Sequence, residues 1–145
     1  MSEAWTMTEA PEVAAPAGGP LRWDVTSLPE VSASRRDLRT TLMALPDGHG
    51  RIECVDELLS TFEELVSNGV RHGHGPVEVT VTVTDRGYLI DVSHDAADQP
   101  PVPSVDRDPG SGGLGLPMVA RLAAGHDWFP RQGREHVWAC IPCAA

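Results

Sequence analysis

Residues 51–93 decide the fold, and they read RIECVDELLSTFEELVSNGVRHGHGPVEVTVTVTDRGYLIDVS. Over residues 51–71 the apolar side chains recur every three or four positions, which predicts one long helix. Over residues 77–83 valine alternates with Glu or Thr, which predicts a half-buried strand. The turn at residues 85–87 leads into a second strand over about residues 88–93, so the two strands form a hairpin.

Shorter segments on either side complete the expected architecture. Residues 21–25 alternate and predict a strand that Pro29 ends, and Ser32 or Ser34 is then expected to cap a helix that runs to about Leu45. The last expected elements are a helix over residues 114–124 and two strands over residues 126–129 and 135–141. This order predicts an α+β fold: a two-layer α/β sandwich whose mixed or antiparallel sheet is covered on one face by helices.

The chain has 145 residues and a formal net charge of −10, with arginine as its only basic residue besides histidine. Residues 1–20, rich in Ala, Pro and Gly, are predicted to be a disordered tail, and residues 21–145 a single domain. The acidic balance argues against a nucleic-acid partner. The missing lysine excludes Schiff-base chemistry and a Walker A site. Neither an apolar run long enough to span a membrane nor a signal peptide is recognisable.

Three cysteines, Cys54, Cys140 and Cys143, indicate a reducing compartment. The last two have the C-x-x-C spacing of a redox site, but such a site needs a helix directly behind the first cysteine, where the helix N-terminus lowers its pKa. The sequence leaves no room for that helix. We therefore expect that Cys140 and Cys143 lie at the end of a last strand without a special role. The weaker alternative is a C-x-x-C thiol protein, in which Cys140 would have a lowered pKa.

The first of three features that suggest chemistry lies in the long helix, which contains Glu64-Leu-Val-Ser-Asn68-Gly-Val-Arg-His72. Glu64 and Asn68 are one turn apart and share a face, opposite the apolar stripe. A carboxylate and an amide oxygen in this arrangement can deprotonate a hydroxyl and ligate a magnesium ion. A solvated helix face is the ordinary explanation of such a pair.

The other two features follow the hairpin. Asp95 comes after the second strand, where a carboxylate can accept a hydrogen bond from an exocyclic amine such as that of adenine; Asp91 is the alternative, although it should face a sheet surface. Residues 112–119 read GGLGLPMV, glycines that allow close approach of a phosphate in front of a helix N-terminus. Between them, residues 96–113 contain four prolines and three glycines and predict a binding loop or lid. Each feature alone is a weak signal.

Together these residues resemble the GHKL superfamily of Bergerat-fold, histidine-kinase-like ATPases. The N box resembles the segment from Glu64 to His72, which implies that Glu64 is the catalytic base and Asn68 the magnesium ligand. The G1 box is matched by Asp95-Ala-Ala-Asp98-Gln without its glycines, which implies that Asp95 binds the adenine amino group. The G2 box resembles Gly113-Leu114-Gly115-Leu116, which would hold the phosphates.

Within this superfamily the chain is most similar to the small anti-sigma-factor serine/threonine kinases. Their usual ending resembles Glu135-His-Val-Trp138-Ala, and their first helix often carries an arginine cluster such as Arg35-Arg36. The resemblance implies a cytoplasmic ATP- and Mg²⁺-dependent regulator of transcription that phosphorylates or sequesters a sigma factor or an anti-sigma-factor antagonist, with neither nucleic acid nor membrane as a partner. A homodimer is plausible by resemblance. The alternative is a non-catalytic interaction module that keeps the fold and binds nucleotide weakly or not at all.

Overall fold

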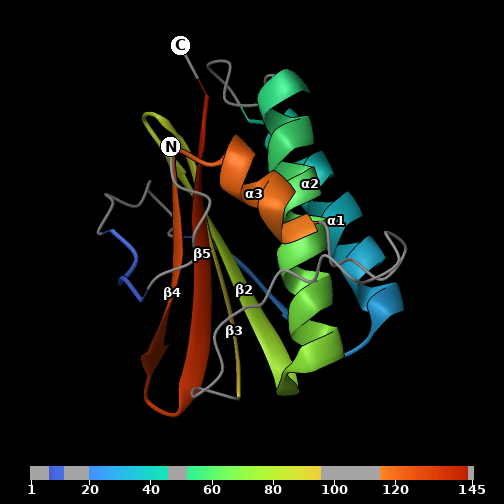
Figure 1. Cartoon of the computed structure of the whole chain (residues 1–145). Coiled ribbons are helices and arrows are strands. Elements are labelled where there is room, and N and C mark those ends of the chain that lie inside the picture. Colours follow the sequence, from blue (N-terminus) through green and yellow to red (C-terminus); the bar gives the residue numbers. More distant parts are fainter. Residues whose placement is uncertain (1–6, 12–19, 46–51, 96–114, 144–145) are drawn as a thin grey trace.

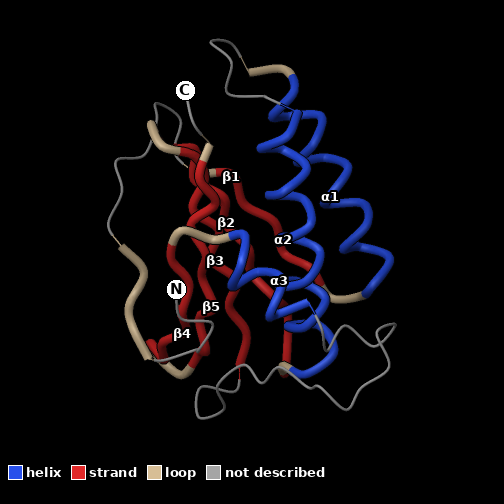
Figure 2. Tube along the Cα trace, turned by 45° about the horizontal axis from the view of Figure 1, so that its top comes forward, coloured by secondary structure: helices blue, strands red, loops and turns tan. Residues whose placement is uncertain are grey.

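The computed structural model describes residues 7–11, 20–45, 52–95 and 115–143. Its helices and strands follow the chain as β1 (Leu21–Val25), α1 (Leu28–Met43), α2 (Ile52–His72), β2 (His74–Thr84), β3 (Gly87–Asp95), α3 (Gly115–Leu122), β4 (Gly125–Arg131) and β5 (Arg134–Pro142). The strands form one sheet in the order β1-β2-β3-β5-β4, and every neighbouring pair is antiparallel. The three helices cover one face of this sheet (Figures 1 and 2). The α+β two-layer prediction is therefore confirmed, with an antiparallel sheet.

Helix α2 is the centre of the helical layer, in contact with α1, α3 and the strands β2, β3 and β5. Its buried side chains include Val55, Leu58, Phe62 and Val66, which are all fully buried. Beneath them lie Val77, Val79 and Val81 of β2, so the alternating valines form the floor of the core as the sequence predicts. The long helix is confirmed to within one residue at each end, and the hairpin turn is confirmed at residues 85–86. Strand β2 begins three residues before the predicted strand, and β3 ends two residues after it.

The start of α1 corrects one expectation. Ser27, not Ser32 or Ser34, caps this helix: its hydroxyl accepts a hydrogen bond from the backbone N–H of Glu30 at 3.4 Å. The Glu30 carboxylate accepts in turn from the Thr26 hydroxyl at 2.6 Å. Pro29 lies in the first turn, where a backbone N–H would have no intrahelical acceptor, so proline costs no hydrogen bond there. Pro29 therefore begins the helix instead of separating it from β1.

The second face of the sheet is partly covered by residues 7–11, which we expected in a disordered tail. The backbone N–H of Thr8 donates to the Trp128 carbonyl at 3.0 Å, and the Trp138 indole N–H donates to the Thr8 carbonyl at 2.7 Å. Ala10 packs on a small cluster formed by Leu89, Phe129 and Trp138. This short piece of the expected tail is therefore ordered on the sheet, because a tryptophan of β5 gives it both apolar contact and a hydrogen bond.

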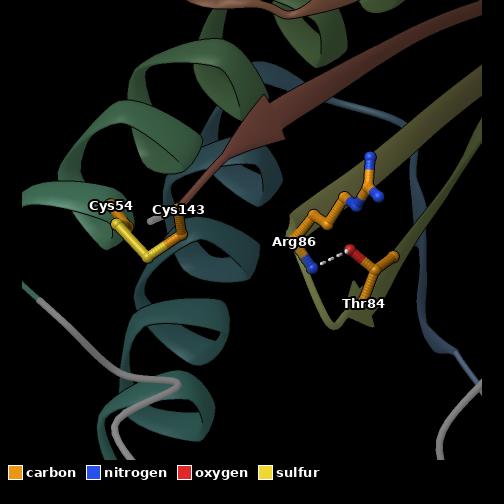
Figure 3. The surroundings of a disulfide bond; sticks show 4 residues. All are labelled: Cys54, Thr84, Arg86 and Cys143. Carbon is orange, nitrogen blue, oxygen red and sulfur yellow. Dashed lines mark hydrogen bonds between the residues drawn. A yellow bond between two sulfur atoms is a disulfide. The ribbon is translucent and has the colours of Figure 1, made fainter. Parts of the chain in front are cut away.

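The expectation that the cysteines have no special role is wrong for Cys143, which is paired with Cys54. Cys54, in the first turn of α2, forms a disulfide with Cys143 directly after β5, and their Cα atoms are 5.5 Å apart (Figure 3). The Cys143 backbone N–H donates to the Arg86 carbonyl at 2.7 Å. Cys143 is therefore fixed both by the turn between β2 and β3 and by its disulfide to α2. Cys140 is free and does not pair with Cys143, which excludes the C-x-x-C disulfide in this structure.

No helix in the described part of the chain is long and apolar enough to cross a membrane.

Candidate functional site

Glu64 and Asn68 lie in the middle and last third of α2, and both are half-buried. Glu64 does not lie on a fully solvated helix face, the ordinary explanation of the Glu64/Asn68 pair, because it lines a groove to which α1 and α3 also contribute. Its Oε2 atom is inaccessible to solvent and has no hydrogen-bond partner among the described residues, and the same is true of Glu63 Oε2. Two adjacent carboxylates thus each present one unsatisfied oxygen, which costs free energy unless a ligand supplies a donor or a cation.

These carboxylates line a groove of about 610 Å³ between the three helices. That volume is within the range of small-molecule sites. Helix α2 contributes one wall, the first half of α1 the opposite wall, and the first turn of α3 one end. The lining residues are Ser32, Arg35, Arg36, Ser60, Glu63, Glu64 and Met118.

Burial raises the pKa of Glu64 above its ordinary value; the charge of Arg71 opposes this shift, and the charge of Glu63 adds to it. The cause is desolvation, which disfavours the ionised form. A carboxylate with a raised pKa is a stronger proton acceptor once ionised, as a general base requires. The groove therefore contains a basic oxygen without an internal partner.

The opposite wall of the groove carries two guanidinium groups. Arg35 is half-buried and Arg36 is exposed, and neither has an ion-pair partner within 4.0 Å among the described residues. Arg39, one turn further along α1, differs: its Nη1 lies 3.1 Å from Asp56 Oδ1 of α2. The sequence showed the arginine cluster, and the spacing of Ser32, Arg35 and Arg36 places them on one helical face. The spacing does not show that this face lies opposite Glu64, because that placement depends on how α1 packs on α2.

Asp95 does not join Glu64 and Asn68. It is the last residue of β3 and not a residue beyond the strand, so the alternation of the strand places it on the same face as Ser93, away from the helices. There the Arg134 Nη1 donates to Asp95 Oδ1 at 3.1 Å. Asp91, the alternative, also lies on this face, 3.0 Å from His136 Nδ1. In this structure neither carboxylate points toward the groove.

The glycine-rich segment is only partly described. Gly113 and Leu114 lie outside the described residues, as does the expected loop over residues 96–113. Gly115 begins α3, and the Leu116 side chain is 1% exposed within the hydrophobic core. A role for Leu116 in phosphate binding is thus limited to its backbone, while its side chain anchors α3. The neighbouring Met118 reaches the groove, which brings the first turn of α3 to the same site as Glu64.

The residues present can accept the magnesium ion that the resemblance implies. No group of three His, Cys, Asp or Glu side chains among the described residues forms a metal site by itself. Magnesium, however, is usually held by one or two protein oxygens together with water and substrate phosphates. The Asn68 amide, one turn from the unsatisfied Glu64 oxygen, fits that pattern as a single protein ligand, although Asn68 is not among the residues that line the groove.

Sequence reasoning missed a second buried charge site, at the C-terminal end of α2. His94 of β3 and Glu135 of β5 face each other across the sheet, with 3.0 Å between His94 Nε2 and Glu135 Oε2, and their side chains are 7% and 5% exposed. The His94 Nδ1 lies 2.9 Å from the Asp95 carbonyl. Burial by itself lowers the pKa of His94, but the hydrogen bonds to Glu135 and Asp95 and the charge of Glu135 outweigh it and raise the pKa.

Two glycines of the helix end make room for this imidazole. A Cβ atom at Gly73 would lie 2.4 Å from His94 Cγ, and a Cβ at Gly69 would lie 3.3 Å from His94 Cδ2. The glycine after Asn68 in the N-box-like segment thus has a packing role beside the buried histidine. The period-two pattern of β3 would have placed His94 on the buried face, but its partner on β5 depends on the strand register.

No protein-family model matches the sequence, and the comparison with curated proteins also finds no match.

Proposed function

We propose that this protein is an ATP-binding regulator of the anti-sigma-factor serine/threonine kinase type, built on the histidine-kinase-like ATPase fold. The observation that carries the proposal is the groove at Glu64, which contains a basic carboxylate with an unsatisfied oxygen and is also lined by Met118 of α3. The Asn68 amide lies one turn further along α2. The α+β sandwich with α2 across an antiparallel sheet is compatible with the fold that the resemblance implies.

In the proposed reaction Glu64 accepts the proton of a serine or threonine hydroxyl of a partner protein. The hydroxyl oxygen forms a bond to the γ-phosphorus of ATP while the bond to the β-bridging oxygen breaks, and ADP leaves. Asn68 would hold Mg²⁺, which would supply neutralising charge on the phosphate oxygens. The raised pKa of Glu64 favours its role as acceptor.

The proposed partners are a sigma factor, an anti-sigma-factor antagonist, or both, contacted through α1 and the sheet edge, and the outcome is regulation of transcription. We propose that the protein binds neither nucleic acid nor a membrane. The assembly that the resemblance allows is a homodimer. The proposed location is the cytoplasm. Because cytoplasmic thiols are normally reduced, this location requires that Cys54 and Cys143 occur there mainly as thiols.

A second function, sequestration of a partner without catalysis, is favoured by the position of Asp95. Its ion pair with Arg134 lies on the face of the sheet opposite the groove, so the expected adenine contact would need this pair to break and the strand end to turn. The alanines that follow Asp95 replace glycines of the G1 box, which makes that turn harder.

Equilibrium binding of ATP to the purified chain, with and without Mg²⁺, tests the proposal. Kinase-type function predicts saturable ATP binding that needs Mg²⁺ and is weaker in Asn68→Ala. It also predicts transfer of phosphate to a captured partner, and this transfer should be lost in Glu64→Gln. Binding that is absent in the folded protein would reject nucleotide-dependent function and leave sequestration. Asp95→Asn adds a separate readout: a loss of about ten- to a hundredfold in ATP affinity supports the adenine role, and unchanged affinity leaves Asp95 as the structural partner of Arg134.

A further inference from the structure

The groove holds opposite charges apart instead of pairing them. Arg35 and Arg36 line one wall and Glu63 and Glu64 the other, yet no ion pair within 4.0 Å joins them among the described residues. Arg39 on the same helix does pair with α2, through Asp56, so the two helices are close enough for such contacts elsewhere. The Oε2 atoms of Glu63 and Glu64 are inaccessible to solvent and have no partner among the described residues, so a bound group that supplies a donor or a cation would offset their desolvation cost.

The chemistry of that group is narrow. It must offer anionic oxygens to two guanidiniums and, on its other side, a hydroxyl donor or a cation to the carboxylates. A terminal phosphate satisfies both requirements, because arginine binds phosphate in a fork geometry and the phosphate carries a metal ion or meets an attacking hydroxyl on its other side.

We infer that Arg35 and Arg36 bind the terminal phosphate of the nucleotide and so distinguish ATP from ADP. This inference rests on the proposed function for the nucleotide, and it assigns to α1 the positive charge that the chain cannot supply from lysine, which it lacks. The half-buried Arg35 is the stronger contributor because its interaction is less screened by solvent than that of the exposed Arg36. The site is thus built from α1, α2 and α3 together.

The test is equilibrium binding of three probes in the presence of Mg²⁺: ATP, ADP and inorganic tripolyphosphate. The variants are Arg35→Gln, Arg36→Gln and the double substitution. Arg39→Gln is the matched control, because it removes an arginine of the same helix that pairs with Asp56 outside the groove lining. Thermal unfolding of each variant shows whether the fold is intact.

The inference predicts that the double variant loses about ten- to a hundredfold in ATP affinity, that Arg35→Gln alone loses more than Arg36→Gln, and that ADP affinity changes less than about twofold. The control keeps wild-type affinity for both nucleotides. Equal losses for ATP and ADP, or an unchanged ATP affinity in the folded double variant, would overturn it. Binding of a polyglutamate peptide that is lost in the double variant, with ATP affinity unchanged, would assign the arginines to acidic side chains of a partner and also overturn it.

The tripolyphosphate arm separates this inference from the proposed function. If the wild type binds neither nucleotide but binds tripolyphosphate in a manner that depends on Arg35 and Arg36, the proposed function fails and the phosphate site stands. If it binds none of the three probes, both fail.

Discussion

Helix α2 carries buried carboxylate chemistry at two places with opposite character. At its C-terminal end it packs on His94, whose imidazole is paired with Glu135, a carboxylate nearly excluded from solvent. In its middle it carries Glu64, half-buried in a groove and without an ion pair among the described residues. One oxygen of each carboxylate, Glu64 Oε2 and Glu135 Oε1, lacks a hydrogen-bond partner there, so the two differ in their ion pairing. The first carboxylate has its counter-charge inside the fold, and the second faces guanidiniums that remain apart from it.

The difference in ion pairing distinguishes a charge that stabilises the fold from a charge that is available to a ligand. Removing one member of a buried pair leaves the other uncompensated, which costs several kcal/mol. Removing a buried charge that has no internal partner relieves a desolvation cost instead. Stability and ligand binding should therefore respond in opposite ways at the two places.

His94→Gln should cost about 3–5 kcal/mol of unfolding free energy, because it leaves Glu135 buried without a positive partner. Urea unfolding at pH 6 measures this. His136→Gln is the control, since His136 pairs with Asp91 at a more accessible position on the other face, and it should cost much less. Equal losses in the two variants would contradict the special role of the buried pair.

The same pair predicts a pH dependence. The pKa of His94 is raised in the folded protein, so its contribution to stability is fully present below its ordinary pKa of 6.5 and is lost as the pH rises through the raised value. The wild type should therefore lose stability over that interval, and His94→Gln should lose less. Parallel pH profiles of the two proteins would exclude His94 as the titrating group.

Reduction of the Cys54–Cys143 disulfide should cost about 2–4 kcal/mol, because the bridge closes a loop between residues 89 positions apart and restricts the unfolded chain. It acts at the N-terminal end of α2, so it should leave Mg²⁺-dependent nucleotide binding at Glu64 unchanged while the protein stays folded. Unfolding with and without dithiothreitol measures the effect, and Cys140→Ser is the control that should not change it. Equal stability of the two redox forms would contradict the prediction.

Gly73→Ala should destabilise the protein by about 1–3 kcal/mol, because its Cβ would meet the His94 ring at 2.4 Å. Gly69→Ala is the matched change four residues earlier, inside α2. Its closest contact would be 3.2 Å, to Val77, and the gain in helix propensity offsets much of the crowding. If Gly69→Ala is the more costly of the two, the packing assigned to the buried imidazole is wrong.

Glu64→Gln should change stability least, by less than about 0.5 kcal/mol or toward higher stability. The pKa of Glu64 is raised, so its ionised form costs stability above the ordinary carboxylate pKa of 4.5, and glutamine removes that cost. Chemical unfolding at pH 7 measures it, beside a nucleotide-binding curve. A large loss of stability would show that Glu64 serves the fold and would remove it from the proposed site.

The sequence predicted the elements whose periodicity is local. The heptad-like spacing of α2 and the alternating valines of β2 depend only on neighbouring residues, and both are where we expected them. The beginning of α1 was missed because Pro29 was interpreted as a break, although proline is equally suited to a first turn.

The candidate site could be predicted only in part, because its geometry depends on contacts between distant segments. Glu64 and Asn68 were found from their spacing on one helix. The direction of Asp95 was not, because β3 extends further than expected and the strand alternation turns the carboxylate to the far face. The disulfide, the His94–Glu135 pair and the arginines opposite Glu64 join residues from separate elements, and no local pattern in the sequence specifies them.

Hydrogen–deuterium exchange of the full chain, with and without Mg²⁺ and ATP, tests most directly whether the groove and not the buried pair serves the ligand. We predict slower exchange in peptides that contain Arg35 and Arg36, in those that span Glu64 and Asn68, and in the first turn of α3, with no change in the β4–β5 turn at Gln132 and Gly133. Exchange that is unaffected in all three helices at saturating nucleotide, or that slows only on the outer face of the sheet, would contradict the account.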